Sequence, residues 1–181
     1  MGTYRGLMFA SLAADGITLD EHLGPLAKAE IDIAFDLSPA GKIDVSCGAH
    51  KYGYGGNWKL QSENATDGYH LGFVHLAMLK TVGSQYQRFV GDEKSIKAVL
   101  RDWGNGHTEI DWAPGFQQPF EWFGGVSEGM VARYLTAMEE RYGKETTQQR
   151  IFDGPPHALI FPNLFLGEMN IAIMQPIGVD E

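Results

Sequence analysis

The sequence contains little cysteine, no long apolar run and no basic segment. One cysteine in 181 residues excludes a disulfide framework and suits a reducing cytoplasm. No apolar run reaches the roughly 20 residues that a membrane-spanning helix needs. The 14 Lys and Arg residues against 23 Asp and Glu give a net charge of −9, and no basic stripe is present to neutralise nucleic-acid phosphates. We therefore expect a cytoplasmic protein that binds neither membranes nor nucleic acid.

The remaining composition suits one packed domain. A chain of 181 residues with 44 % hydrophobic residues is large enough to bury a core. The sequence has no phosphate-binding loop and no dinucleotide-binding fingerprint. We therefore expect any nicotinamide cofactor to act through a partner protein.

Periodicity predicts a mixed α and β structure without a linker. Thr18 and Glu21 stand at the positions of a capping box, and Pro25 is well placed to begin a helix that runs to about Phe35. Further helices are predicted over 58–74 and 127–142, and strands over 43–47, 107–112, 158–161 and 169–174.

Residues 57–75 hold the pattern that points to chemistry. On a helix of 3.6 residues per turn, Asn64, Asp67 and His70 would share one face, and His75 follows five residues after His70. Histidine is a common metal ligand, and a ligating imidazole usually donates its other ring N–H to a carboxylate. The set predicts two ligands of a 2-His-1-carboxylate iron site, with Asp67 beside the first histidine.

The five-residue spacing of the two histidines tests this interpretation. Positions five apart diverge by roughly 140° on a straight helix, so both imidazoles could not face one metal ion. We therefore expect a bend, a π-type turn or a helix end around Leu71 and Gly72, where glycine makes the deformation easy.

The same segment resembles the large (alpha) subunit of the aromatic-ring-hydroxylating Rieske oxygenases. The family pattern Glu-Asn-x-x-Asp-x-Tyr-His-x-x-x-x-His is met without a gap by residues 63–75. Residues 4–12 resemble the strand that closes the family's Rieske domain, and 157–163 resemble a later strand that passes the active site. The resemblance implies that 1–14 is the tail of the Rieske-domain region and 15–181 a partial catalytic domain. Its implied fold is α+β of the helix-grip type, an antiparallel sheet with flanking helices, truncated at both ends.

The resemblance also implies roles for individual residues. His70 and His75 would bind a mononuclear Fe(II), Asp67 would bridge His70 to the Rieske cluster of a neighbouring subunit, and Asn64 would sit just outside the coordination sphere. His157 would either contact substrate or be a plain strand-end histidine. The implied substrate pocket comprises Gly68, Leu71, Gly72, His157, Phe161 and Leu166.

Two departures from the family lead us to expect a fragment that is inactive by itself. A Rieske cluster needs two cysteines and two histidines, and Cys47 with His50 matches half of that pattern on what we interpret as an ordinary strand. We expect the 2Fe–2S cluster in the full-length protein and the acidic third iron ligand beyond this chain. In-chain alternatives for that ligand are Asp111, Asp153 and Glu168.

The implied reaction inserts oxygen from O2 into an aromatic ring, giving a cis-dihydrodiol or a hydroxylated ring. The motif context favours a benzoate-like or salicylate-like substrate. The resemblance implies a reductase or ferredoxin, a small beta subunit and a homo-oligomer as partners.

Two other classes of protein remain open. A zinc hydrolase could also use two histidines and a carboxylate. A non-catalytic helix-grip protein could bind an apolar ligand without any metal. Iron with oxygen-dependent turnover would separate the first interpretation from both.

Overall fold

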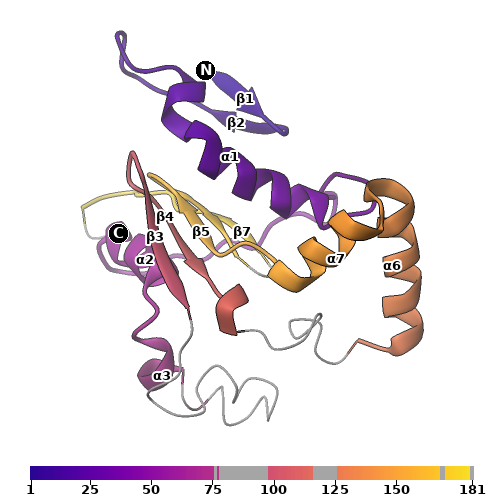
Figure 1. The fold of residues 1–181 in the computed structure, drawn as a ribbon. Coiled ribbons are helices and arrows are strands. Elements are labelled where there is room, and N and C mark those ends of the chain that lie inside the picture. The colour runs from indigo at the N-terminus through magenta and orange to yellow at the C-terminus, as the bar shows by residue number, and fades with distance from the viewer. Residues whose placement is uncertain (76, 78–97, 116–125, 168–169, 180–181) are drawn as a thin grey trace.

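The fold combines an antiparallel sheet with helices in a computed structural model that describes residues 1–75, 77, 98–115, 126–167 and 170–179 (Figure 1). A short hairpin comes first, followed by the helices α1, α2 and α3, then two strands, the helices α6 and α7, and three more strands. The elements are β1 (Gly2–Tyr4), β2 (Leu7–Phe9), α1 (Leu19–Asp36), α2 (Trp58–Thr66), α3 (Leu71–Val74), β3 (Val99–Gly104), β4 (His107–Asp111), η1 (Ala113–Gly115), α6 (Glu128–Tyr142), α7 (Lys144–Asp153), β5 (Ala158–Ile160), β6 (Leu164–Leu166) and β7 (Ile171–Ile173).

Helix α1 begins and bends where the sequence predicts. The side chain of Thr18 accepts the backbone N–H of Glu21, and the Glu21 carboxylate accepts the N–H of Thr18, which confirms the capping box. Gly24 has a positive φ of 62°, and Pro25 follows it. Glycine tolerates this left-handed conformation and proline suits the first position of the helix that resumes. The predicted helix from Pro25 to about Phe35 is therefore confirmed.

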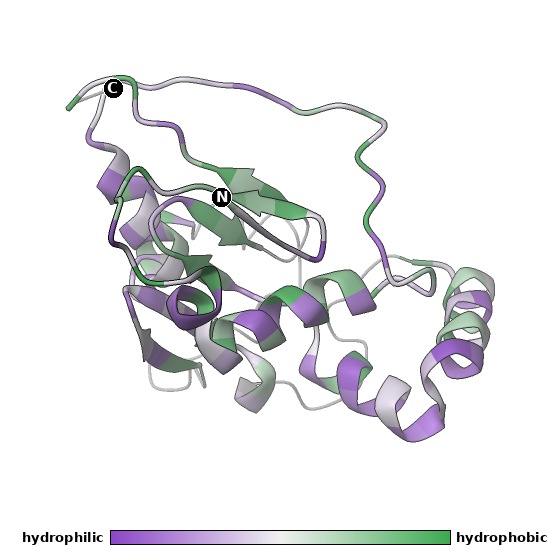
Figure 2. Ribbon diagram, turned by 90° about the horizontal axis from the view of Figure 1, so that it is seen from above, coloured by the Kyte–Doolittle hydropathy of each residue, from purple (hydrophilic) through white to green (hydrophobic). Residues whose placement is uncertain are grey.

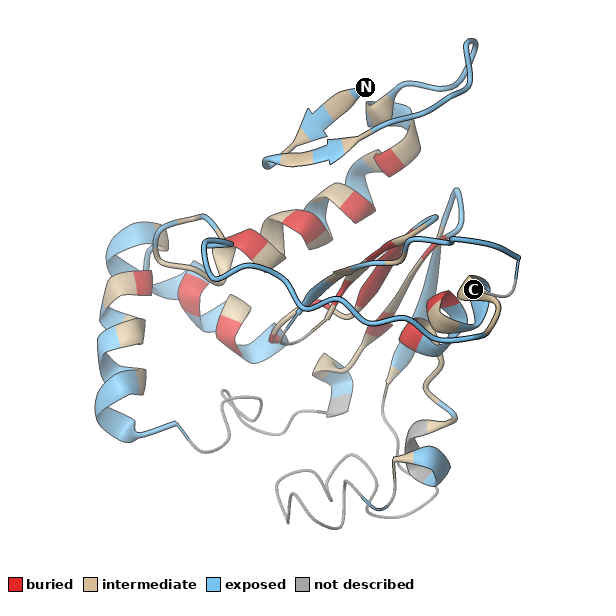
Figure 3. Ribbon diagram, turned by 180° about the vertical axis from the view of Figure 1, so that it is seen from behind, coloured by how far each residue is buried: buried red, intermediate tan, exposed pale blue. Residues whose placement is uncertain are grey.

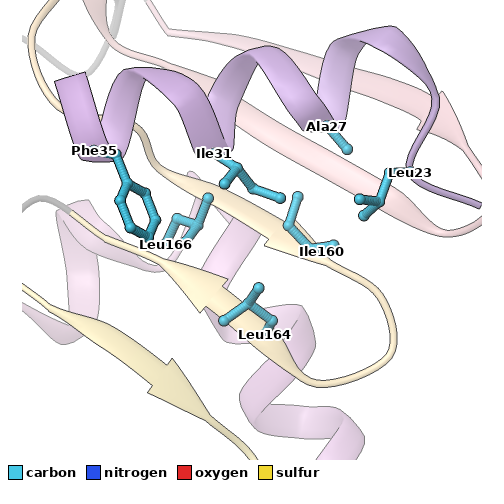
Figure 4. Packing of buried hydrophobic residues seen from close by; sticks show 7 residues of the cluster. All are labelled: Leu23, Ala27, Ile31, Phe35, Ile160, Leu164 and Leu166. Atoms are coloured by element: carbon cyan, nitrogen blue, oxygen red, sulfur yellow. The ribbon is translucent and has the colours of Figure 1, made fainter. Parts of the chain in front are cut away.

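The main core lies between α1 and one face of the five-stranded sheet, whose order is β3-β4-β5-β6-β7 with every neighbour antiparallel. Positions four apart along α1 share one face and pack onto alternate residues of β5 and β6 (Figure 4). The buried cluster comprises Leu23, Ala27, Ile31, Phe35, Ile160, Leu164 and Leu166.

Helix α2 packs on the opposite face of this sheet. It contacts β5 and β4, and it buries Ser62 and Ala65. Because side chains alternate along a strand, Leu159 and Phe165, which are paired across β5 and β6, face away from the α1 core. The sheet thus separates the α1 core from the layer that carries the histidine motif.

Two sequence-based expectations about strands were wrong. Residues 4–12, expected as one strand, instead contain the turn of the hairpin β1–β2, with Arg5 and Gly6 at positive φ between the two strands. Residues 43–47 form no strand, and the chain from 44 to 55 is exposed (Figure 3). There the Asp44 carboxylate accepts the N–H of Ser46 at 2.8 Å, a local bond that competes with sheet pairing.

The predicted strand 107–112 and helix 127–142 are confirmed as β4 and α6, and the strand 158–161 as β5. Strand β7 confirms part of the strand predicted over 169–174, whose first residue lies outside the described part. Hydrophobic and hydrophilic residues alternate along α1, α6 and α7, which is typical of helices half-facing solvent (Figure 2). Across the described residues, no helix is long and apolar enough to cross a membrane.

Candidate metal centre

The two motif histidines lie at the two ends of the short helix α3. Helix α2 ends at Thr66, and Asp67 is already extended, with φ −93° and ψ 110°. His70 is the residue before α3 and His75 the residue after it. The predicted break in the helix therefore exists, but it lies at 67–70 rather than at Leu71 and Gly72.

Asp67 explains why the chain turns at this point. Its Oδ1 accepts the backbone N–H of Tyr69 at 2.8 Å, so the side chain offers the backbone an alternative to helical bonding. This hydrogen bond is the main cause that lowers the pKa of Asp67, and the contact with His70 adds to it. Asp67 is therefore a carboxylate near neutral pH, and it can only accept hydrogen bonds.

The hydrogen-bond partners fix the proton on His70. Oδ2 of Asp67 lies 3.1 Å from Nδ1 of His70. Because a carboxylate only accepts, Nδ1 carries a proton and donates a hydrogen bond to Oδ2. The lone pair on Nε2 of His70 then points at Nε2 of His75, 3.1 Å away. The two rings lie at 63° with centroids 5.0 Å apart. In the absence of a metal ion, a proton on Nε2 of His75 completes this N–H···N contact.

This pair fits a divalent metal ion such as ferrous iron. Two imidazole nitrogens at right angles on a metal, each about 2.1 Å from it, would be about 3.0 Å apart. The observed 3.1 Å between the two Nε2 atoms agrees with that geometry. A carboxylate behind a ligating histidine is the usual arrangement that orients the ring. Within the described residues, no group of three or more His, Cys, Asp or Glu side chains is assembled for a metal.

The described alternatives for a third ligand are engaged elsewhere. Asp111 pairs with Arg101 at 2.7 Å, and Asp153 accepts two bonds from the amide of Gln149. Neither is grouped with the two histidines in the described part of the chain, which favours the expectation that the third ligand lies elsewhere. Glu168 lies outside the described residues.

The other residues predicted for the site are spread over both faces of the sheet. Asn64 is exposed on α2, and Gly68 is partly buried between α2 and α3. The backbone of Leu71 and Gly72 belongs to α3, but their side chains are outside the description, so their pocket role stays a prediction. Leu166 belongs to the core under α1, and we therefore remove it from the predicted substrate pocket.

Two histidines whose roles the sequence did not settle make hydrogen bonds to the backbone of distant elements. His107 is buried, and its Nε2 donates to the carbonyl of His22 at 2.7 Å while its Nδ1 accepts the N–H of Phe161. Burial lowers its pKa, which keeps the ring neutral for both bonds. Phe161 is 42 % exposed and is held by these bonds rather than seated in a described pocket. His157 donates from Nε2 to the carbonyl of Ala65 in α2.

Comparison with known proteins gives this geometry a context. Residues 44–180 match the family described as ring hydroxylating alpha subunit (catalytic domain). The chain is 32 % identical to toluate 1,2-dioxygenase subunit alpha of Pseudomonas putida, over 98 % of this chain and 39 % of that protein. It is 30 % identical to the 2-halobenzoate 1,2-dioxygenase large subunit of Burkholderia cepacia, over 98 % and 38 %. It is 37 % identical to the anthranilate 1,2-dioxygenase large subunit of Acinetobacter baylyi, over 61 % and 24 %.

The fold is also similar to a solved structure of a naphthalene 1,2-dioxygenase mutant bound to phenanthrene. The TM-score is 0.57 at 17 % identity, and the match covers 99 % of this chain and 41 % of that one. This likeness confirms the predicted α+β fold. The chain spans about two fifths of the length of the first two relatives. Because the family match covers most of its residues, the chain belongs to the ring-hydroxylating alpha subunits, within their catalytic domain.

Proposed function

We propose that this chain supplies the mononuclear iron site of an aromatic-ring oxygenase, with His70 and His75 as two of the ligands. The observation that carries the proposal is the 3.1 Å approach of the two Nε2 atoms, with Asp67 behind His70. Family membership favours this function over the zinc hydrolase and the non-catalytic ligand-binding protein.

The described residues orient and hold the ligands. Asp67 keeps the Nδ1 proton of His70 engaged, so Nε2 is the ring nitrogen left to bind the metal. Iron held by protein ligands on one side would supply open positions for dioxygen beside an aromatic ring. We propose that an acidic third ligand and a 2Fe–2S Rieske cluster come from parts of the protein outside the described residues. We further propose that Asp67 lies between that cluster and His70.

The relatives suggest the substrate class. Toluate, 2-halobenzoate and anthranilate, the acids in their names, are all benzoic acids with one ring substituent. We propose an aromatic carboxylic acid of this kind for the present protein. In the proposed dihydroxylation both atoms of O2 are added to the ring, with two electrons and two protons. The electrons come from a nicotinamide cofactor through a reductase or ferredoxin partner, in a cytoplasmic homo-oligomer that can include a small beta subunit.

Isotope labelling tests the proposed function. The protein that carries this chain would be supplied with Fe(II), a ring-hydroxylating reductase, NADH and a panel of benzoate, toluates and anthranilate under 18O2. We expect a diol in which both new oxygen atoms carry the label. A product whose new oxygen is unlabelled, because it comes from water, would instead indicate the zinc hydrolase. Binding of the acids without oxygen uptake would indicate the ligand-binding protein, and either result would overturn the proposal.

Replacing Asp67 by alanine should separate metal binding from turnover. The variant keeps both imidazoles, so iron affinity should fall by no more than the roughly 10–100-fold typical for a lost supporting residue. Turnover driven by the reductase should fall more steeply, because His70 loses its orientation and the proposed link to the cluster. Iron content and NADH-coupled oxygen uptake measure the two effects.

Asp44 offers a matched control for this variant. Its carboxylate accepts the N–H of the residue two positions on at 2.8 Å, as Asp67 does, but it lies in an exposed segment away from the histidines. Asp44→Ala should leave both iron content and coupled turnover unchanged. Full coupled turnover in Asp67→Ala would count against the role proposed for Asp67.

A further inference from the structure

The C-terminal end of α2 is held by a residue that lies far away in the sequence. The last four carbonyl groups of a helix have no partner within it, and that of Ala65 is one of them in α2. Nε2 of His157, 92 residues further along, donates a hydrogen bond to this carbonyl at 2.6 Å. Ala65 is 5 % exposed, so little water is available to replace that donor.

Aromatic neighbours fix the direction of the His157 ring. The ring of Phe165 in β6 meets it edge-on at 5.1 Å and 77°, and the ring of Trp112 after β4 meets it at 6.0 Å and 84°. The imidazole, which precedes β5, therefore stands between groups carried by β4 and β6, the two strands that flank β5 in the sheet. Its N–H connects that sheet to the last turn of α2.

Ala65 is two residues before Asp67, so its position controls the start of the histidine motif. After Thr66 the chain leaves the helix, and Asp67 immediately makes its two contacts, to the N–H of Tyr69 and to Nδ1 of His70. A displaced α2 terminus would move the carboxylate away from the imidazole. The path runs from the sheet through His157 and Ala65 to Asp67 and His70.

We propose that His157 is a positioning residue, which fixes the end of α2 and thereby keeps the Asp67–His70 contact in place. The inference deepens the proposed function, on which its catalytic meaning rests. Of the two roles considered for His157 from the sequence, a substrate contact or a plain strand-end histidine, the hydrogen bond from Nε2 favours a role within the framework.

The test reads out His70 directly in the metal-free protein. Long-range 1H–15N spectra report which ring nitrogen carries the proton, and hydrogen exchange reports the Tyr69 amide. In His157→Phe, which keeps an aromatic ring but has no donor, we expect His70 to lose its single Nδ1–H tautomer. The Tyr69 amide should exchange at least about tenfold faster, since its bond to Asp67 opens more often. His157→Gln, whose amide can donate, should restore most of both signals.

His107 provides the matched control. It also donates from a buried imidazole to a backbone carbonyl, that of His22, but it serves the α1 side of the sheet. His107→Phe should lower the melting temperature but leave the His70 tautomer unchanged. The exchange rate of the Tyr69 amide, compared with that of amides that exchange only by global unfolding, should also stay unchanged. A role of His157 in stability alone would give the same result for both Phe variants.

Unchanged His70 and Tyr69 signals in His157→Phe would overturn the proposal, as would equal changes in His107→Phe. If His157→Phe does not fold, His157→Met replaces it, because methionine has the length of glutamine without a donor, and the Gln–Met difference then decides. Fe(II) loading of the wild-type protein is measured separately. A full-length wild type that binds no iron would refute the proposed function, whereas the metal-free spectra still decide the role of His157.

Discussion

In the full-length protein that carries this chain, replacing either His70 or His75 by alanine is expected to abolish stoichiometric Fe(II) binding and all oxygenation. The two Nε2 atoms face each other at 3.1 Å, so removing one imidazole leaves a single nitrogen at the metal position. The loss of affinity should exceed the roughly 10–100-fold seen when a supporting residue is removed, because a ligand itself is lost. The two variants should therefore be alike, although only His70 contacts Asp67.

Iron content after anaerobic loading and desalting measures this effect, and oxygen uptake follows it. His50→Ala is the control, because His50 is an exposed histidine in the segment before α2. The fold should survive both changes, since neither His70 nor His75 belongs to the buried core cluster. Normal iron content and turnover in either motif variant would exclude that histidine as a ligand.

The parts of the fold that depend on residues close together in the sequence could be predicted from it. The capping box of Thr18 and Glu21 and the restart of α1 at Pro25 are local hydrogen-bonding and φ constraints, and both are present. The spacing of His70 and His75 correctly required a break in the helix. The spacing could not locate the break. The Asp67 side chain forms an Asx-type turn that competes with helix formation, and this turn lies a few residues before Gly72, where the break was expected.

The rest depends on contacts between distant residues. The alternation of residues 43–47 favours a strand, but strand pairing needs a neighbouring strand. In the structure this segment pairs with none of the described strands, and residues 44–47 are exposed. Which face of the sheet Leu166 would occupy depended on where α1 packs. The hydrogen bonds of His107 and His157 span 85 and 92 positions. No local pattern distinguishes such framework histidines from metal ligands or substrate contacts.

Glu30 gives the second large expected effect, which concerns stability rather than the metal. This residue of α1 is partly buried beside a cavity of about 220 Å³ that Glu109, Asp111 and Asp153 also line. Burial raises the pKa of Glu30 to about 7, and the charges of Glu109 and Asp111 add to the shift. Arg101 opposes it from its ion pairs with Glu109 and Asp111.

The sign of the pH dependence follows from this raised pKa. Glu30 takes up a proton near pH 7 in the folded state but only near its ordinary value of 4.5 when unfolded. Between these values the folded state binds more protons, so stability falls as pH rises through the window. The loss is complete above about pH 7 and is on the order of 3 kcal/mol. Below about pH 4.5 the side chain is neutral in both states and contributes no such loss.

Glu30→Gln should therefore stabilise the protein at high pH, since a neutral amide of the same size never carries the buried charge. The melting temperature of the variant should match that of the wild type near pH 4.5 and exceed it by about 5–10 °C at pH 8. Thermal unfolding at several pH values measures the difference, with Glu140→Gln on the exposed face of α6 as a control that should show no such trend. A difference that stays constant with pH would refute the raised pKa. A variant less stable than the wild type at pH 8 would show instead that the Glu30 carboxylate accepts hydrogen bonds that outweigh its repulsion from Glu109 and Asp111.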